Sequence, residues 1–175
     1  MKRPTKDRYY LDLAKTIGLR STCYRSKLGA IIIRDDQIVA TGYVGAPRKT
    51  KDCLERGNCL RDKMEISHGE RYEMCRSVHA EQNAIINAAR AGVSILGGDM
   101  YISGTDGKDN SINTFPCYIC KRMIINAGLN RVICLTNKNK IKIFLVKVIS
   151  AMGYDIEIKE GFAKLRVKIT KKNKE

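Results

Sequence analysis

The sequence predicts an α/β protein in which strands and helices alternate along a single domain. Apolar runs with the composition of strands, such as 29–33 and 131–135, alternate with helical segments such as 77–90. This alternation is typical of a layered fold in which helices pack on a sheet. The chain has 175 residues, of which 43% are hydrophobic, so it can bury a sizeable core as one domain.

The N-terminal part of the chain is expected to form a helix and then a β-hairpin. A helix is predicted over 7–18 because apolar residues recur there at helical spacing, namely Tyr10, Leu11, Ala14 and Ile17. The apolar runs 29–33 and 38–40 flank the polar segment 34–37, which is the pattern of two strands joined by a turn.

A long connection separates this hairpin from the next helix. Residues 45–72 contain glycine, proline and many charged side chains, so we expect a long ordered loop. Because an unsupported loop of that length is uncommon in a compact domain, some interaction should hold it. The helix that follows is predicted over 77–90, where alanine and isoleucine recur at helical spacing, and Gly92 is expected to end it.

Shorter elements are predicted in the C-terminal half. A strand is expected at 100–102, followed by a polar and flexible segment at 104–114. Pro116 stands where a helix-opening proline belongs, and that helix should run to Gly128. The next strand is expected at 131–135.

The end of the chain is expected to add a helix over 141–152 and a last strand over 154–158. The whole chain would then be one domain, with its core at about 9–158. A basic tail would cover 159–175.

The charge of the chain favours anionic partners. It has 33 basic and 18 acidic residues and a net charge of +15, which suits nucleotides, nucleic acid or acidic surfaces. Because much of the excess lies near the chain ends, as in the final KKNKE, we expect a small nucleotide rather than nucleic acid. No apolar run approaches the roughly 18–20 residues that span a membrane, and the basic start lacks the apolar segment of a signal peptide. We therefore expect a cytoplasmic protein without membrane contact, in which seven cysteines serve metal or catalytic roles rather than disulfides.

Two short motifs indicate metal-dependent acid–base chemistry. His79 stands two residues before Glu81 at one predicted helix start, and Cys117 and Cys120 stand three apart at another. A helix N-terminus favours the thiolate form that zinc requires. One nitrogen and two thiolates would leave the fourth position of zinc open to water, as in catalytic rather than structural sites. Glu81 would lie close to the metal without binding it, and could take and return the proton of that water.

The blocks around these motifs resemble the zinc-dependent cytidine deaminase superfamily and, within it, the bacterial deoxycytidylate (dCMP) deaminases. The matching blocks, in chain order, are 20–23, 29–32, 41–48 (TGYVGAPR), 75–85 (CRSVHAEQNAI), 116–121 (PCYICK) and 124–128. The resemblance spans about residues 9–158. It implies a mixed sheet with helices on both faces, a three-layer α/β/α sandwich. It also implies hydrolysis of dCMP to dUMP and ammonia, which supplies dUMP for thymidylate synthesis.

The resemblance also implies roles for single residues. The catalytic zinc would be held by His79, Cys117 and Cys120. Glu81 would shuttle the proton, and the backbone N–H of Ala80 would contact the pyrimidine carbonyl. Arg25 or a nearby basic residue would bind the nucleotide phosphate.

A second, structural zinc is often present in this family. Its ligands would be Cys23, Cys53 and Cys75, completed by Cys59 or His68. Four thiolates would make a closed site of the structural type and would hold the long loop. The alternative is that these cysteines are small buried hydrophobes, as Cys134 in its apolar strand is expected to be.

The sequence departs from the common family pattern in two places. Val44 stands where many relatives have an asparagine that helps to hold the sugar hydroxyl. Because valine can neither donate nor accept that hydrogen bond, sugar recognition is expected to differ. The segment 104–114 is longer than the usual turn and could form a flap that changes substrate choice.

Several alternatives stay open at this level. Another cytosine nucleotide or a nucleoside shares the reacting ring with dCMP. A deaminase of tRNA or single-stranded nucleic acid would use the positive charge, and a non-enzymatic zinc protein would have no need of Glu81. The resemblance further implies a homo-oligomer and regulation by dCTP and dTTP.

Overall fold

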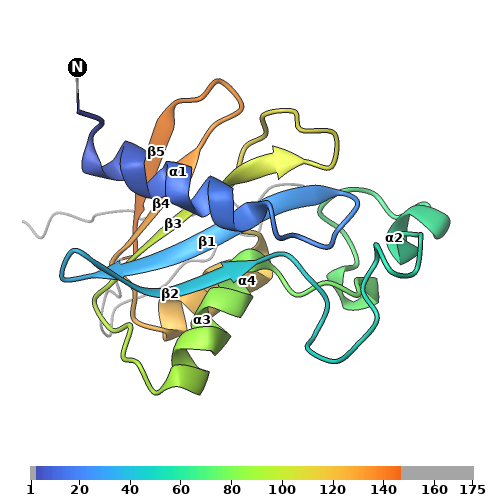
Figure 1. Ribbon diagram of the computed structural model, residues 1–175, viewed down its shortest axis with the longest axis horizontal. Coiled ribbons are helices and arrows are strands. Elements are labelled where there is room, and N and C mark those ends of the chain that lie inside the picture. The colour runs from blue at the N-terminus through green and yellow to red at the C-terminus, as the bar shows by residue number, and fades with distance from the viewer. Residues whose placement is uncertain (1–2, 147–175) are drawn as a thin grey trace, which may run out of the picture.

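The structure, a computed structural model, describes residues 3–146 of the chain. Its centre is a mixed five-stranded sheet with the order β2-β1-β3-β4-β5 (Figure 1). The strands are β1 (Ser26–Arg34), β2 (Gln37–Tyr43), β3 (Asp99–Asp106), β4 (Arg131–Leu135) and β5 (Ile141–Leu145). The helices are α1 (Lys6–Gly18), α2 (Leu60–Lys63), α3 (Ala80–Ala91) and α4 (Tyr118–Asn126), with a 3-10 helix, η1, at Tyr72–Met74.

The pairing of the strands explains the mixed character of the sheet. β3 and β4 run parallel and are connected through α4, whereas the other neighbouring pairs are antiparallel. The hairpin of β1 and β2 confirms the one predicted from the sequence. Its two turn residues, Asp35 and Asp36, both have positive φ (51° and 62°), as a two-residue type I′ turn requires.

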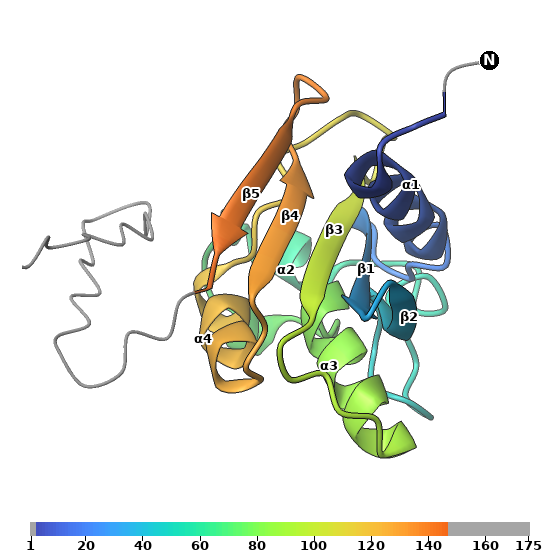
Figure 2. The ribbon, with the colours of Figure 1, turned by 90° about the vertical axis from the view of Figure 1, so that its left-hand side faces the viewer.

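Side chains alternate along the strands between two cores, one on each face of the sheet. One core lies under α1 and includes Tyr10, Leu11, Ala14, Ile31, Tyr101 and Ile133. The other lies under α3 and α4 and includes Ala84, Ile124, Ile32, Ile102 and Cys134. Figures 1 and 2 show α1 on one side of the strands and α3 and α4 on the other. The predicted three-layer arrangement and the core position of Cys134 are therefore confirmed.

The prediction of a helix over 141–152 is wrong where the structure describes that segment. Residues 141–145 form β5, which pairs with β4 along its length, Ile143 opposite Ile133. Ile141, Lys142 and Ile143 alternate apolar and charged side chains, and the β-branched isoleucines favour a strand. The predicted strand 154–158 and the basic tail 159–175 lie outside the described residues.

The boundaries of other elements also differ from the predictions. Residues 104–106 belong to β3 rather than to the flexible segment, because they pair with the beginning of β1. α3 begins at Ala80 and α4 at Tyr118, so both start later than predicted. His79 and Cys117 consequently precede their helices in extended conformation (ψ 157° and 171°).

Arginine side chains hold the long loop between β2 and α3. Arg61 is only 4% exposed, and its Nη2 donates to the carbonyl oxygens of Ser67 (2.6 Å) and Glu70 (2.5 Å). Arg76 Nη1 donates to the backbone and side-chain oxygens of Asn58 (3.1 and 3.0 Å). These bonds satisfy the carbonyl groups of irregular backbone, which is the support that a loop of this length needs.

Candidate metal centre

Three predicted ligands meet at the N-terminal ends of α3 and α4. The Nδ1 atom of His79 lies 3.4 Å from the Sγ of Cys117 and 3.4 Å from the Sγ of Cys120. All three ligand atoms lie within 4.8 Å of one another. Within residues 3–146, no other group of three or more histidine, cysteine or acidic side chains is gathered in this way.

The position of His79 follows from how α3 is anchored. The backbone N–H of His79 donates to Oε1 of Gln82 (3.0 Å), and this bond caps the start of α3. Nδ2 of Asn83 donates to the carbonyl of Tyr43 (2.7 Å) and ties the first turn to the end of β2. A Cβ on Gly42 would lie 2.3 Å from the backbone nitrogen of Ala84, so only glycine lets α3 come this close to the strand.

The cysteines are positioned by the segment that precedes α4. Thr114 is 2% exposed, and its Oγ1 donates to the carbonyl of Ile102 (2.8 Å) in β3. The same oxygen accepts from the N–H of Leu135 (3.1 Å) in β4. This bridge fixes the chain three residues before Cys117, and Cys120 follows in the first turn of the helix.

Hydrogen bonding and burial assign different protonation to the two thiols. A hydrogen bond from Cys120 lowers the pKa of Cys117 to about 4, against the opposing effect of burial, and His79 lowers it further. The same hydrogen bond and burial raise the pKa of Cys120. Burial works against the charged form of His79, but Cys117 and Glu81 raise its pKa above the usual value. The lowered pKa of Cys117 favours its thiolate form, which is the form that binds zinc.

Glu81 lies on the first turn of α3 and is 5% exposed. Burial raises the pKa of its carboxyl group, although the charge of His79 opposes the shift. It is not among the residues whose ligand atoms meet. A buried carboxyl group that readily holds a proton next to a metal site has the properties of a general acid–base group.

These donors fit a zinc ion. One imidazole nitrogen and two thiol sulfurs are ligands that zinc prefers, and the lowered pKa of Cys117 favours the thiolate form that zinc requires. Three protein ligands are the number found in catalytic zinc sites, which keep a position for water or substrate.

The cysteines predicted for a second zinc do not form a comparable group. Cys53 and Cys59 are buried, Cys23 and Cys75 are partly buried, and His68 is exposed. Burial raises the pKa of Cys53, and the nearby thiols of Cys23 and Cys59 raise it further, so these three are neighbours. The second zinc stays a prediction.

The other predicted site residues have definite places in the fold. Arg25 forms an ion pair with Asp62 (3.2 Å) and donates to the carbonyl of Ile66 (3.2 Å), while its buried Nη1 has no partner among the described residues. Val44 is 4% exposed and belongs to the core under α3. Ala80 is the first residue of α3 and is fully buried.

One residue near the metal centre was missed in the sequence. The ring of Tyr72 lies edge-on against the ring of His79, with 4.7 Å between their centroids. The sequence gives no sign of this contact, because Tyr72 and His79 are joined by irregular backbone whose path cannot be predicted from residue spacing.

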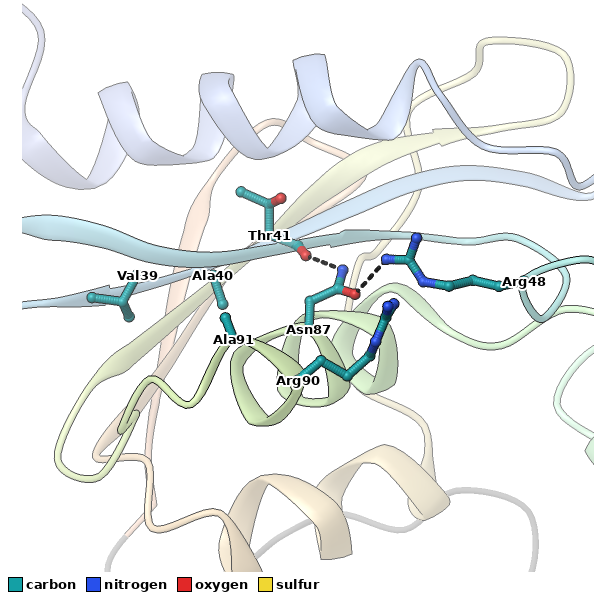
Figure 3. Close-up of a pocket in the computed structure, with 7 residues that line it drawn as sticks. All are labelled: Val39, Ala40, Thr41, Arg48, Asn87, Arg90 and Ala91. Atoms are coloured by element: carbon teal, nitrogen blue, oxygen red, sulfur yellow. Dashed lines mark hydrogen bonds between the residues drawn. The ribbon is translucent and has the colours of Figure 1, made fainter.

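A shallow pocket of about 440 Å³ lies elsewhere on the molecule, between β2 and the C-terminal half of α3 (Figure 3). Arg48 and Arg90 border it, and Asn87 links Arg48 (3.0 Å) to the backbone of Thr41 (2.8 Å). It contains none of the predicted site residues, so it is separate from the metal centre.

No helix in the described part of the chain has the length and apolar character needed to cross a membrane.

Comparisons with known proteins agree with this geometry. Residues 4–136 match the cytidine and deoxycytidylate deaminase zinc-binding region. The chain is 33% identical to a deoxycytidylate deaminase of Schizosaccharomyces pombe over 140 residues, which cover 78% of this chain and 39% of that protein. It is 31% identical to the deoxycytidylate deaminase of Mycobacterium phage D29, over 76% of this chain and 96% of the phage protein.

A solved structure shares the fold. The dCMP deaminase of cyanophage S-TIM5 in complex with dCMP and dUMP superposes with a TM-score of 0.53 and 26% identity, covering 75% of this chain and 82% of that one. The chain thus spans most of the phage relatives and well under half of the yeast relative.

Proposed function

The chain belongs to the cytidine and deoxycytidylate deaminase zinc-binding family, and on this premise we propose that it hydrolyses dCMP to dUMP and ammonia. The observation that carries the proposal is the convergence of one histidine nitrogen and two thiols beside a buried carboxyl group, that of Glu81. The names of the fission yeast and phage relatives, and the dCMP and dUMP bound by the cyanophage protein, support dCMP as the substrate.

His79, Cys117 and Cys120 would hold the zinc ion. When bound, zinc acts as a Lewis acid that makes water a nucleophile near neutral pH. The hydrolysis forms a bond from the water oxygen to C4 of the pyrimidine and breaks the bond from C4 to the amino nitrogen. The water supplies the oxygen of the new carbonyl group. One of its protons stays on the ring nitrogen N3 of dUMP, and the other leaves with ammonia.

Glu81 would carry the proton between these steps. Its carboxylate accepts one proton from the attacking water and delivers it to the ring nitrogen, and it then accepts the second and delivers it to the departing amine. Burial raises the pKa of this carboxyl group, which makes its carboxylate a stronger base for the water proton.

The start of α3 would orient the pyrimidine ring. The first N–H groups of a helix have no acceptor within the helix, so the N–H of Ala80 is suited to donate to the pyrimidine carbonyl oxygen. The phosphate would lie toward Arg25, whose Nη1 lacks a partner among residues 3–146. Val44 would leave the sugar hydroxyl without the hydrogen bond that an asparagine supplies there.

Assembly and regulation belong to the same proposal. A homo-oligomer is supported by exposed apolar side chains on the edge strand β5, which are Ile141 (39%), Ile143 (46%) and Leu145 (52%). Regulation by dCTP and dTTP is proposed from the family resemblance alone. A cytoplasmic location is proposed from the sequence alone.

Ammonia release by the purified chain tests the proposed activity. Cytidine, deoxycytidine, CMP, dCMP and dCTP are compared, and the zinc content per chain is measured on the same sample. We expect dCMP to be preferred. If another compound of the panel were preferred, the assigned substrate would change to that compound. If zinc-loaded protein released no ammonia from any of them, the proposal would be contradicted.

A Glu81→Gln variant tests the mechanism. Glutamine keeps the shape of the side chain but cannot accept and return a proton, so we expect turnover to fall by at least about 100-fold while zinc stays bound. Substantial activity in this variant would show that another group moves the proton.

A further inference from the structure

Tyr72 stands in the loop at a point where the backbone is constrained. It opens the short helix η1, and the preceding Arg71 has a left-handed conformation (φ 47°, ψ 52°). A residue with a side chain adopts this region at a cost, and it does so where the surrounding structure demands it. The backbone conformation of Arg71 therefore fixes the direction in which the chain presents Tyr72.

The ring of Tyr72 contacts a predicted zinc ligand. Its centroid lies 4.7 Å from that of His79, and the ring planes meet at 84°. An edge-to-face contact restricts rotation of the imidazole ring. That rotation decides whether Nδ1 faces the two thiols, from which it now lies 3.4 Å. Groups outside the ligand set commonly fix the ring orientation of metal-binding histidines, most often through a hydrogen bond to the second ring nitrogen. Here a ring contact would serve the same purpose.

A buried arginine holds Tyr72 in turn. The guanidinium carbon of Arg61 lies 4.8 Å from the centroid of the Tyr72 ring, in a cation–π contact. The same guanidinium group binds the carbonyl oxygens of Ser67 and Glu70, so it cannot move without opening the loop. Arg61, Tyr72 and His79 thus form a continuous line of contacts from the loop to the metal centre.

The two side chains behind His79 differ in their burial. Tyr72 is only half-buried, whereas Arg61 behind it is almost completely enclosed.

We propose that Tyr72 is a positioning residue of the metal centre, which Arg61 holds against His79 so that the imidazole presents Nδ1 to the incoming metal ion. The long loop then contributes to metal affinity without supplying a ligand. The inference rests on the zinc site of the proposed function but not on its substrate.

Metal binding by three variants tests this role. Zinc affinity is measured by competition with a chromogenic chelator, and the cobalt-substituted proteins are compared by their visible absorption. An edge-to-face ring contact corresponds to roughly a 2- to 12-fold change in an equilibrium constant. We expect Tyr72→Leu to weaken zinc binding by that factor and to change the cobalt spectrum. Tyr72→Phe, which keeps the ring, should have the zinc affinity and the cobalt spectrum of the unsubstituted protein.

The matched control is Tyr9→Leu. Tyr9 also contacts an aromatic ring, that of Tyr10 at 5.2 Å, but it lies on α1 at the opposite face of the sheet. We expect this variant to bind zinc with unchanged affinity. Wild-type affinity and an unchanged cobalt spectrum in Tyr72→Leu would overturn the proposal, as would equal losses in Tyr72→Leu and Tyr9→Leu.

Two further observations keep the test decisive. If Tyr72→Leu does not fold, Tyr72→Met removes the ring while filling the space with a flexible side chain. The metal-binding measurements use no nucleotide, so they are independent of the ammonia assay. A protein that binds zinc but does not release ammonia would contradict the proposed function, and the zinc affinities of the variants would still decide the role of Tyr72.

Discussion

Thr114→Val should destabilise the protein more than its small change in shape suggests. The substitution keeps the branched side chain but removes the hydroxyl group that bridges β3 and β4. One hydrogen bond, to the carbonyl of Ile102, is lost at a net cost of about 0.5–1.5 kcal/mol. The N–H of Leu135 also loses its partner, and an unsatisfied buried group costs about 1–3 kcal/mol. We therefore expect a loss of about 1.5–4.5 kcal/mol in the free energy of unfolding.

Urea unfolding of metal-free protein measures this loss directly, with Thr114→Ser as the matched control. Serine keeps the hydroxyl and removes one methyl group, which should cost only about 1 kcal/mol. If valine destabilised the protein no more than serine, the hydroxyl bridge would contribute less to the free energy of unfolding than its burial and geometry indicate.

The same variant should weaken the metal centre. Thr114 lies three residues before Cys117, and its bridge fixes the segment that carries both thiols. We expect zinc affinity to fall in Thr114→Val and to be kept in Thr114→Ser. Equal zinc affinity in the two variants would show that Pro116 and α4 position the cysteines without this bridge.

Four other predictions concern the metal centre and the predicted second zinc. Gly42→Ala would force α3 away from β2, because the new Cβ would lie 2.3–2.4 Å from backbone atoms of that helix. We expect a loss of about 1–3 kcal/mol in stability and a fall in turnover on the order of 100-fold. Gly45→Ala should be milder, because its Cβ would meet only side-chain atoms, those of Thr22 at 3.2 Å and Tyr43 at 3.3 Å. Equal effects of the two substitutions would contradict this explanation. In metal-free protein, iodoacetamide should alkylate Cys117 at a rate that stays constant from pH 8 down to about 5, because its pKa is about 4 and the thiolate persists above that value. A rate that falls tenfold per pH unit below pH 8 would refute this, and Cys117→Ser identifies the reacting thiol. Chelation of zinc should lower stability by about 4 kcal/mol relative to protein at zinc concentrations a thousandfold above the dissociation constant. A zinc content of two ions per chain would confirm the second, structural zinc, whereas one ion per chain with all of Cys23, Cys53, Cys59 and Cys75 reduced would contradict it.

The zinc ligands could be predicted because their arrangement is mostly local. Cys117 and Cys120 stand three apart at a helix start, a spacing that brings both thiols to one side whatever the rest of the fold. His79 likewise directly precedes α3, and Glu81 lies in the first turn of that helix. The β-branched residues Ile141 and Ile143 were an equally local signal for β5, although a helix was predicted there.

The support of the long loop could not be predicted in the same way. The sequence indicated that 45–72 needed an anchor, and cysteines were the expected one. The structure shows a different anchor that the sequence did not indicate, because Arg61 binds two carbonyl groups of the loop. An arginine in a charged segment gives no sign that it will be 4% exposed, because burial depends on what packs around it.

By itself, the sequence determined which side chains can hold zinc, which carboxyl group lies beside them, and the alternation of strands and helices. Residue type and short spacing suffice for these features. Only the tertiary structure decided that His79 and Cys117, 38 residues apart, meet at 3.4 Å and that Tyr72 packs against the ligand ring. Such contacts depend on strand order and on two helices sharing one face of the sheet, and no local periodicity specifies either.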